Sequence, residues 1–214
     1  MDKRTFEIPA PPVSLMGDVA VPAEAGGLVV FAHGSGSSRL SARNGQVAAA
    51  LNERGFATLL LDLLTVEEER DRANVFDIEL LSDRLVAATR WAAEQGETEG
   101  LPVGYFGAST GAGAALRAAA ALGDGIGAVV SRGGRPDLAG GSLERVTAPT
   151  LLIVGGADRT VLGLNEQAAA RLRCPHRIEI VPGATHLFEE PGALERVAEL
   201  AGAWFARLTR GPAL

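Results

Sequence analysis

The chain has 214 residues, of which 47% are hydrophobic, and this is enough for one domain with a substantial core. Its formal net charge of −6 at pH 7 argues against nucleic acid and membranes as partners, because nucleic acid and anionic membranes attract basic surfaces. Lys3 is the only lysine and Cys174 the only cysteine, which excludes an intrachain disulfide and a metal cluster built from cysteines.

Short apolar runs alternate with helical patterns along the chain. A segment at 13–22 fits an antiparallel edge strand or hairpin, and the apolar runs then lie at 27–33, 56–62, 103–107, 126–132, 150–156 and 177–183. These runs are continuously apolar, as in parallel strands that helices cover on both faces. The helical patterns lie at 41–54, 77–95, 110–122, 162–173 and 191–208. The alternation predicts a doubly wound, mostly parallel α/β sheet with helices on both faces, in one domain over residues 1–214.

One serine stands between two glycines where a predicted strand becomes a helix. The stretch Gly107-Ala108-Ser109-Thr110-Gly111 matches the G-x-S-x-G nucleophile elbow, a tight strand-to-helix turn that projects the serine hydroxyl above the sheet. Glycines at the flanking positions avoid collisions between neighbouring side chains and the strand or helix. Ser109 is therefore the candidate nucleophile. The alternatives are a serine that only caps the helix and a glycine-rich turn that cradles a phosphate.

A serine hydroxyl needs a base, and the base needs a carboxylate. His186 follows the last predicted strand, on a loop at the sheet end where Ser109 is expected, so we take it as the base. Asp158 follows the preceding strand, and the chain order Ser109, Asp158, His186 is the order typical of this elbow. Asp62 also ends a strand and is the reserve candidate for the acid, although capping the next loop is its simpler interpretation.

The loop after the first apolar strand is rich in glycine and serine and leads into a helix. We expect an oxyanion hole formed by the backbone amides of Ser35 and Thr110, with Gly34 and Gly36 allowing the backbone to approach the substrate. His33, Gly34, Arg39 and Arg132 are candidate substrate-binding residues.

Several arginines follow strand ends at the same edge of the predicted sheet. A guanidinium there could bind a substrate carboxylate, or it could pair with the acidic stretch at 67–71 and hold that loop in place. Arg135, Arg43 and Arg159 share this ambiguity. The loop at 63–77 is the best candidate for a partial cover of the site. The segment at 133–149 is too short for a lid domain.

These motifs together resemble the α/β-hydrolase superfamily, and more narrowly the dienelactone hydrolase-like group of small members without a lid. The resemblance extends from "GGLVVFAHGSGSSRLSARN" through "GYFGASTGAGAAL" to "VGGAD" and "GATHLFEEPGAL". It implies the same triad and the same oxyanion hole. Dienelactone hydrolases proper carry a cysteine nucleophile, and the serine here favours ordinary ester hydrolysis. Domains of this type also resemble ones fused to phosphoribosyltransferases, an activity that we do not carry over.

The resulting hypothesis is a serine hydrolase that cleaves small carboxylic esters through an acyl-enzyme on Ser109, without a metal or organic cofactor. A lactone or dienelactone-type hydrolase, a thioesterase, an amidase or an acyltransferase would use the same triad. A non-catalytic binding protein on a hydrolase scaffold is a third possibility. The first residues lack the apolar core of a signal peptide, and no apolar run approaches the roughly 20 residues that span a bilayer. We therefore expect a cytoplasmic protein.

Overall fold

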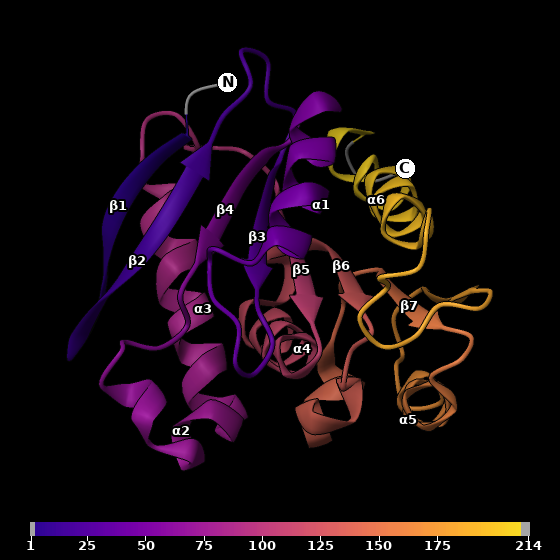
Figure 1. The fold of residues 1–214 in the computed structure, drawn as a ribbon. Coiled ribbons are helices and arrows are strands. Elements are labelled where there is room, and N and C mark those ends of the chain that lie inside the picture. The colour runs from indigo at the N-terminus through magenta and orange to yellow at the C-terminus, as the bar shows by residue number, and fades with distance from the viewer. Residues whose placement is uncertain (1–2, 211–214) are drawn as a thin grey trace.

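The computed structural model describes residues 3–210 and is built on one eight-stranded sheet (Figure 1). The strands lie in the order β1-β2-β4-β3-β5-β6-β7-β8, and all neighbours are parallel except β1 with β2 and β2 with β4. The bounds are β1 Lys3–Ala10, β2 Val13–Ala20, β3 Leu28–Ala32, β4 Ala57–Leu61, β5 Val103–Ala108, β6 Ile126–Arg132, β7 Thr150–Gly155 and β8 His176–Val181.

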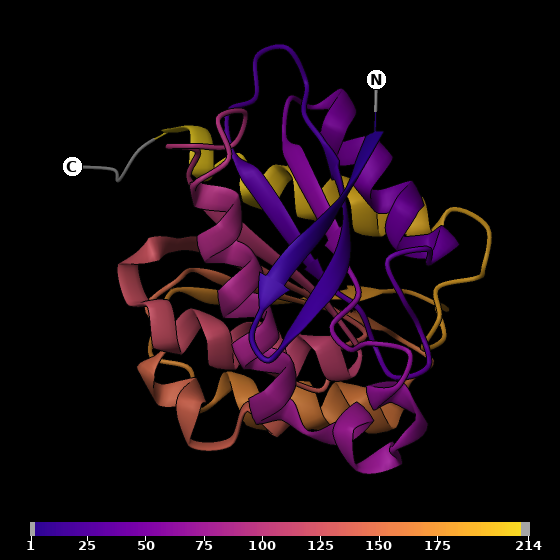
Figure 2. The ribbon, with the colours of Figure 1, turned by 90° about the vertical axis from the view of Figure 1, so that its left-hand side faces the viewer.

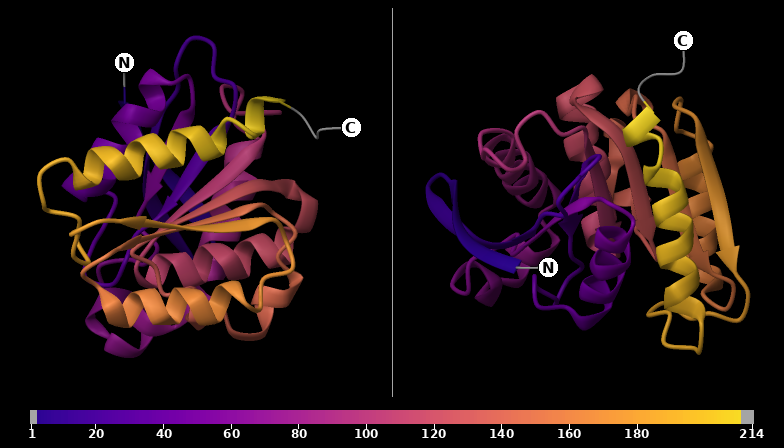
Figure 3. Two further views of the ribbon diagram at one scale, coloured as in Figure 1. Left: turned by 90° about the vertical axis from the view of Figure 1, so that its right-hand side faces the viewer. Right: turned by 90° about the horizontal axis from the view of Figure 1, so that it is seen from above.

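Helices cover both faces of this sheet. The helices are α1 Ala42–Glu53, α2 Arg72–Phe76, α3 Ile78–Ala93, α4 Thr110–Leu122, α5 Arg159–Ala169 and α6 Ala193–Phe205. One apolar cluster joins the sheet to α3, α4 and α5, and a second joins the opposite face to α1 and α6. Figure 2 shows α3 lying along the face behind the β1–β2 hairpin, and Figure 3 shows α6 on one side of the sheet with α4 and α5 on the other. The predicted doubly wound fold is confirmed.

The N-terminal segment forms the expected antiparallel hairpin, with a first strand that the sequence pattern did not predict. Sequence patterning suggests an edge strand or hairpin at 13–22, whereas the structure forms β1 and β2 and places β1 at the edge. β1 is not a continuously apolar run, because its side chains alternate, with Ile8 and Ala10 buried and their neighbours exposed. Such a strand faces the core on one side only, so its apolar content is low.

Local capping sets where the helices begin. The side chain of Ser41 accepts a hydrogen bond from the Asn44 amide at the start of α1, and Asp77 does the same for the Leu80 amide at the start of α3. Asp158 caps α5, which is why this helix begins three residues before the sequence pattern suggests. The carboxyl ends of the central parallel strands and the amino ends of these helices therefore meet at one edge of the sheet.

Two connections at that edge bear on access to the site. The segment after β6 forms a short 3₁₀ element at Pro136–Arg145, kinked at Gly140, and no lid domain. The expected cover at 63–77 folds as a 3₁₀ turn followed by α2. Across residues 3–210, none of the helices is long and apolar enough to cross a bilayer.

Candidate active site

Ser109 occupies the strained turn between β5 and α4. Its backbone has φ 50° and ψ −123°, a conformation that non-glycine residues rarely adopt. A Cβ on Gly107 would lie 2.5 Å from the Cα of Ala112, and one on Gly111 would collide with the carbonyl oxygen of Ala32. The two glycines are therefore required for the turn to form, as the motif suggests.

The serine side chain does not cap its helix. Ser109 stands at the N-cap of α4, where a serine commonly accepts a hydrogen bond from the first-turn amides, yet it makes no such side-chain bond. Its hydroxyl is half-buried and lies beside Gly34, at which a Cβ would approach Ser109 Oγ to 3.6 Å. The capping interpretation of this residue is wrong, and the hydroxyl is left available at the sheet edge.

His186 and Asp158 lie together at the same edge. His186 Nδ1 is 2.8 Å from Asp158 Oδ2, while Asp158 Oδ1 accepts the Val161 amide at 3.3 Å. One carboxylate thus caps α5 and orients the imidazole. With its Nδ1 proton on this bond, His186 keeps an unprotonated Nε2 that can accept a proton from a hydroxyl. The ring remains partly accessible, with 39% of the side chain exposed.

Ser109 and His186 are linked through the turn that follows β6. The Ser109 amide donates to the carbonyl of Arg132 at 3.3 Å, and a Cβ on Gly133 would lie 3.7 Å from His186 Nδ1. Among the described side chains, Ser109 Oγ forms no hydrogen bond with His186. Such bonds are often long in enzymes without substrate.

The expected oxyanion loop carries a contact that the sequence pattern does not reveal. The backbone amide of Ser35 donates to Thr110 Oγ1 at 2.9 Å, so the loop after β3 is tied to the first residue of α4. As the first residue of that helix, Thr110 has a backbone amide with no acceptor inside the helix. The two expected donors therefore lie side by side, and one of them is engaged by the side chain of the other.

His33 is fixed by the backbone on both sides of its ring. Nδ1 donates to the carbonyl of Gly34 at 2.9 Å, and Nε2 accepts the amide of Leu63 at 3.0 Å. The residue is buried, and burial lowers the pKa of its imidazole. With both nitrogens used, His33 braces the loops after β3 and β4 and has no polar atom left for substrate. His33 also lines the small hollow beside Gly34 and Ser35, and its expected role in substrate binding stays a prediction.

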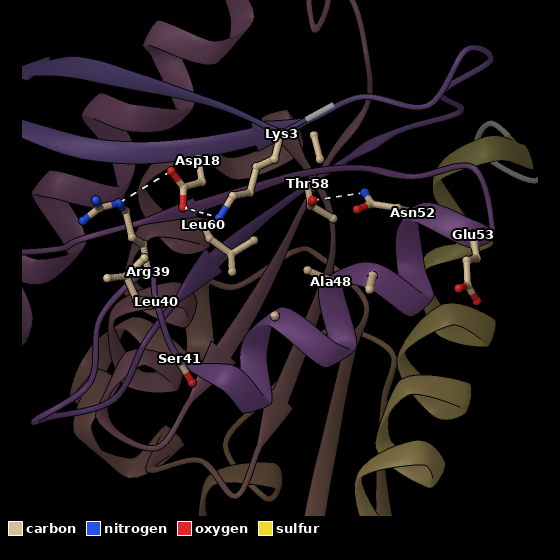
Figure 4. Close-up of a pocket in the computed structure, with 13 residues that line it drawn as sticks. Lys3, Asp18, Arg39, Leu40, Ser41, Ala48, Asn52, Glu53, Thr58 and Leu60 are labelled. Atoms are coloured by element: carbon tan, nitrogen blue, oxygen red, sulfur yellow. Dashed lines mark hydrogen bonds and ion pairs between the residues drawn. The ribbon is translucent and has the colours of Figure 1, made fainter. Parts of the chain in front are cut away.

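Arg39 lies in a groove of about 570 Å³ between α1 and the sheet (Figure 4). Its guanidinium pairs with Asp62 at 2.5 Å and approaches the buried Asp18 of β2 at 3.6 Å. These two carboxylates hold Arg39 against β2 and the end of β4, and its expected role in substrate binding stays a prediction. Because Asp62 is engaged by Arg39, it does not serve as the acid for His186.

The other arginines do not pair with the acidic stretch at 67–71. Arg132 is buried against Asn44, Arg43 pairs with the exposed Glu189, and Arg135 pairs with Asp137. The stretch is held instead by Arg84 of α3, whose guanidinium bonds to Glu68 at 2.7 Å. The pairing of these arginines with the acidic stretch is therefore wrong, and the binding of a substrate carboxylate stays a prediction.

A small hollow lies between the oxyanion loop and the segment after β4. Gly34, Ser35 and Thr110 line it on one side, and Leu64 and Val75 on the other. The segment at 63–77 therefore packs beside the expected oxyanion loop, and its role as a partial cover of the site stays a prediction.

The comparisons with known proteins agree with this architecture. The sequence pattern of the Dienelactone hydrolase family matches residues 15–208. A crystal structure of a dienelactone hydrolase from Anabaena variabilis is 54% identical, with a TM-score of 0.93 over 96% of this chain and 97% of that one. A serine hydrolase without a lid from Xanthomonas campestris shares the fold, with 22% identity and a TM-score of 0.75 over 100% of this chain and 97% of that one.

Two curated relatives, from two strains of Mycobacterium tuberculosis, are named as candidate phosphoribosyl transferases. Each is 62% identical over 206 residues, which is 96% of this chain but 46% of the relative. The chain thus spans about half the length of these relatives. By the family match and by the Anabaena structure, the chain belongs to the dienelactone hydrolase family.

Proposed function

We propose that this chain is a serine hydrolase that cleaves small carboxylic esters through an acyl-enzyme on Ser109. The observation that carries the proposal is the pairing of an uncapped serine in a strained elbow with a His186–Asp158 hydrogen bond at the same sheet edge. A strained backbone conformation persists where the surrounding structure enforces it, and such positions cluster at active sites. Membership in a hydrolase family supports the same reaction class.

The first half of the reaction is acylation. His186 Nε2 accepts the hydroxyl proton as Ser109 Oγ bonds to the ester carbonyl carbon, and the carbonyl oxygen becomes an oxyanion. Asp158 stabilises the imidazolium through its bond to Nδ1. The amides of Ser35 and Thr110 receive the oxyanion. Collapse breaks the bond to the alkoxy oxygen, which leaves as an alcohol with the proton returned by His186.

The second half repeats these steps with water. His186 takes a proton from water as the water oxygen bonds to the acyl carbon. Collapse then breaks the bond to Ser109 Oγ, which receives the proton back from His186, and the carboxylic acid leaves. The hollow beside the oxyanion loop, walled by Leu64 and Val75, has a volume of about 10 Å³, which is room for about one water molecule. Lactones, dienelactones and thioesters present the same carbonyl chemistry and are the alternative substrates, and transfer to an acceptor other than water would give an acyltransferase.

The Mycobacterium relatives that are named as phosphoribosyl transferases are about twice as long as this chain, and the match covers 46% of each. Phosphoribosyl transfer is not part of the proposal, because the residues at this edge of the sheet form an acyl-transfer arrangement and the matching family is one of hydrolases.

A panel of p-nitrophenyl acetate, butyrate and octanoate tests the proposal, with Ser109→Ala alongside. We expect the wild type to turn over acetate and butyrate faster than octanoate and the variant to lose activity by several orders of magnitude. Equal turnover by the variant would contradict the proposal. If the wild type is inactive on these esters but active on lactones or thioesters, the proposed substrate class changes and the proposed mechanism stays.

A further inference from the structure

The turn after β6 forms hydrogen bonds with both backbone polar groups of the candidate nucleophile. The amide of Ser109 donates to the carbonyl of Arg132 at 3.3 Å, and the amide of Arg135 donates to the carbonyl of Ser109 at 2.9 Å. These bonds hold the backbone on either side of the strained serine. The segment 132–135 therefore fixes the elbow in place, independently of the glycines that make room for it.

The same turn supports the loop that carries the candidate base. Gly133 has φ 51°, and its amide donates to the carbonyl of Ile153 at 2.8 Å. A Cβ built on Gly133 would lie 3.0 Å from the carbonyl oxygen of His186 and 3.2 Å from Cε2 of Phe188. The base loop thus rests directly on this glycine, without room for a side chain between them.

Phe188 closes the turn that presents His186. Its amide donates to the carbonyl of Thr185 at 3.3 Å, which places His186 second in a four-residue turn. Phe188 has φ 56°, and within residues 3–210 it and Ser109 are the two non-glycine residues with positive φ. Its ring is 1% exposed. A phenylalanine with a left-handed backbone conformation is unfavourable by itself, so the burial of its ring must hold it in place.

Arg132 lies over the ring of Phe188. Its guanidinium carbon lies 6.0 Å from the centroid of the Phe188 ring, within the range of a cation–π interaction. The residue is 7% exposed, one guanidinium nitrogen donates to Asn44 Oδ1 at 3.2 Å, and Nε has no partner among the described residues. No carboxylate of the described residues pairs with it.

Burying a guanidinium without a counter-ion costs free energy, so other interactions must offset that cost. Burial, with a contribution from Arg43, lowers the pKa of Arg132 to about 10, so the group remains charged at neutral pH. A cation attracts the face of an aromatic ring most strongly where water is excluded. Among the described residues, its recorded contacts are the hydrogen bond to Asn44 and the position over the Phe188 ring.

We propose that Arg132, Gly133 and Phe188 form one positioning unit that holds the His186 loop in register with Ser109. The unit rests on the proposed function, since it sets the relative position of the proposed base and nucleophile. Arg132 and Phe188 act through His186 and touch no reacting atom. The unit assigns Arg132 a role in catalysis that does not involve binding a substrate carboxylate.

The test compares Phe188→Leu and Arg132→Met with Arg132→Lys and with Phe56→Leu. Phe56 is a buried ring of the same apolar cluster, packed on Phe205 and remote from the site, so its variant controls for loss of core packing. We expect Phe188→Leu and Arg132→Met to lower kcat by about 10- to 100-fold with KM nearly unchanged, because small displacements of a catalytic group have effects of this size. Arg132→Lys, which keeps the charge, should recover part of the loss.

A second readout needs no substrate. The proton shared by His186 Nδ1 and Asp158 gives a strongly downfield NMR resonance, which we expect to shift or broaden in Phe188→Leu and Arg132→Met and to stay unchanged in Phe56→Leu. Unchanged kcat and an unchanged resonance in the first two variants, with a loss of stability like that of Phe56→Leu, would overturn the proposal. If the wild type hydrolyses no ester, the proposed function fails separately, and the resonance still decides whether the unit positions His186.

Discussion

The backbone amide of Ser35 donates to the hydroxyl of Thr110 at 2.9 Å, across 75 positions of sequence. The bond ties the loop after β3 to the first turn of α4, so the two expected oxyanion donors are brought together before any substrate is bound. An oxyanion hole is effective when its donors are already oriented. The threonine hydroxyl therefore orders the Ser35 amide, and it must release or share this donor as the oxyanion forms.

Thr110→Val tests that role. Valine keeps the shape but removes the acceptor, so the loop at 34–36 loses its tie to the helix. We expect kcat on short esters to fall by about tenfold to 100-fold, less than the loss of an entire oxyanion donor, which is about 10²–10³. Thr110→Ser retains the hydroxyl and should stay near wild-type kcat. A rise in kcat for Thr110→Val would mean that the hydroxyl competes with the oxyanion.

Asp158→Asn separates the two functions of its carboxylate. Asparagine is also a good N-cap, so α5 keeps its first-turn bond and the free energy of unfolding should change by less than about 1 kcal/mol. The amide group stabilises the imidazolium poorly and favours the wrong tautomer, so kcat should fall by about 10⁴-fold. Steady-state kinetics and urea unfolding measure the two effects. A small loss of kcat would argue against Asp158 as the acid.

His33 should make stability depend on pH in the mildly acidic range. Burial lowers the pKa of its imidazole in the folded state, whereas the unfolded chain titrates near the ordinary value of 6.5. The unfolded state therefore binds more protons, and the contribution of His33 to stability is present above 6.5 and lost as pH falls toward the lowered native pKa.

His33→Asn removes this titration. The wild type should be the more stable protein at neutral pH, because the variant lacks the bond to the Leu63 amide, and its advantage should shrink between about pH 7 and about pH 5. Urea unfolding of both proteins across that range measures the difference. An advantage that stays constant or grows on acidification would contradict the assignment of a neutral, buried imidazole.

Two glycine substitutions should have opposite effects. Gly111→Ala places a methyl group against the carbonyl oxygen of Ala32, so we expect a loss of stability and of activity together. Gly45 lies in α1 with open space around its Cα, and Gly45→Ala should raise stability by about 0.5–1 kcal/mol with activity retained. Thermal unfolding and ester turnover of the two variants give the comparison. A stable, active Gly111→Ala protein would show that the elbow is less tight than described.

The parts of the site that the sequence predicts are those built from local motifs and strand ends. Gly107 and Gly111 are recognisable because the steric demand of the elbow falls on neighbouring residues. Asp158 and His186 are recognisable because parallel strands place their following loops at one edge. The fold class is recognisable because strands covered by helices on both faces are continuously apolar in sequence. Each of these features depends on residues that are close in sequence or on the order of the strands along the chain.

What could not be predicted depends on contacts between distant segments. The bond from Ser35 to Thr110, the burial of Arg132 against Asn44 and the pairing of Arg39 with Asp62 join segments that are far apart in sequence. The left-handed backbone of Phe188 has no local signal either, since glycine or asparagine would be expected there. The arginines at strand ends left open a bound carboxylate or a pairing with the acidic stretch, and the partners that the structure gives Arg39 and Arg43 are carboxylates from other segments.

The most direct test of the central claim is covalent labelling with a fluorophosphonate, followed by peptide mass spectrometry. Attack by Ser109 Oγ would form an O–P bond and release fluoride, with the serine proton passing to His186. The account predicts one adduct per chain on the peptide that contains Ser109, no adduct in Ser109→Ala, and slow labelling in His186→Ala. Absence of labelling in a folded wild type, or an adduct on another residue, would contradict it.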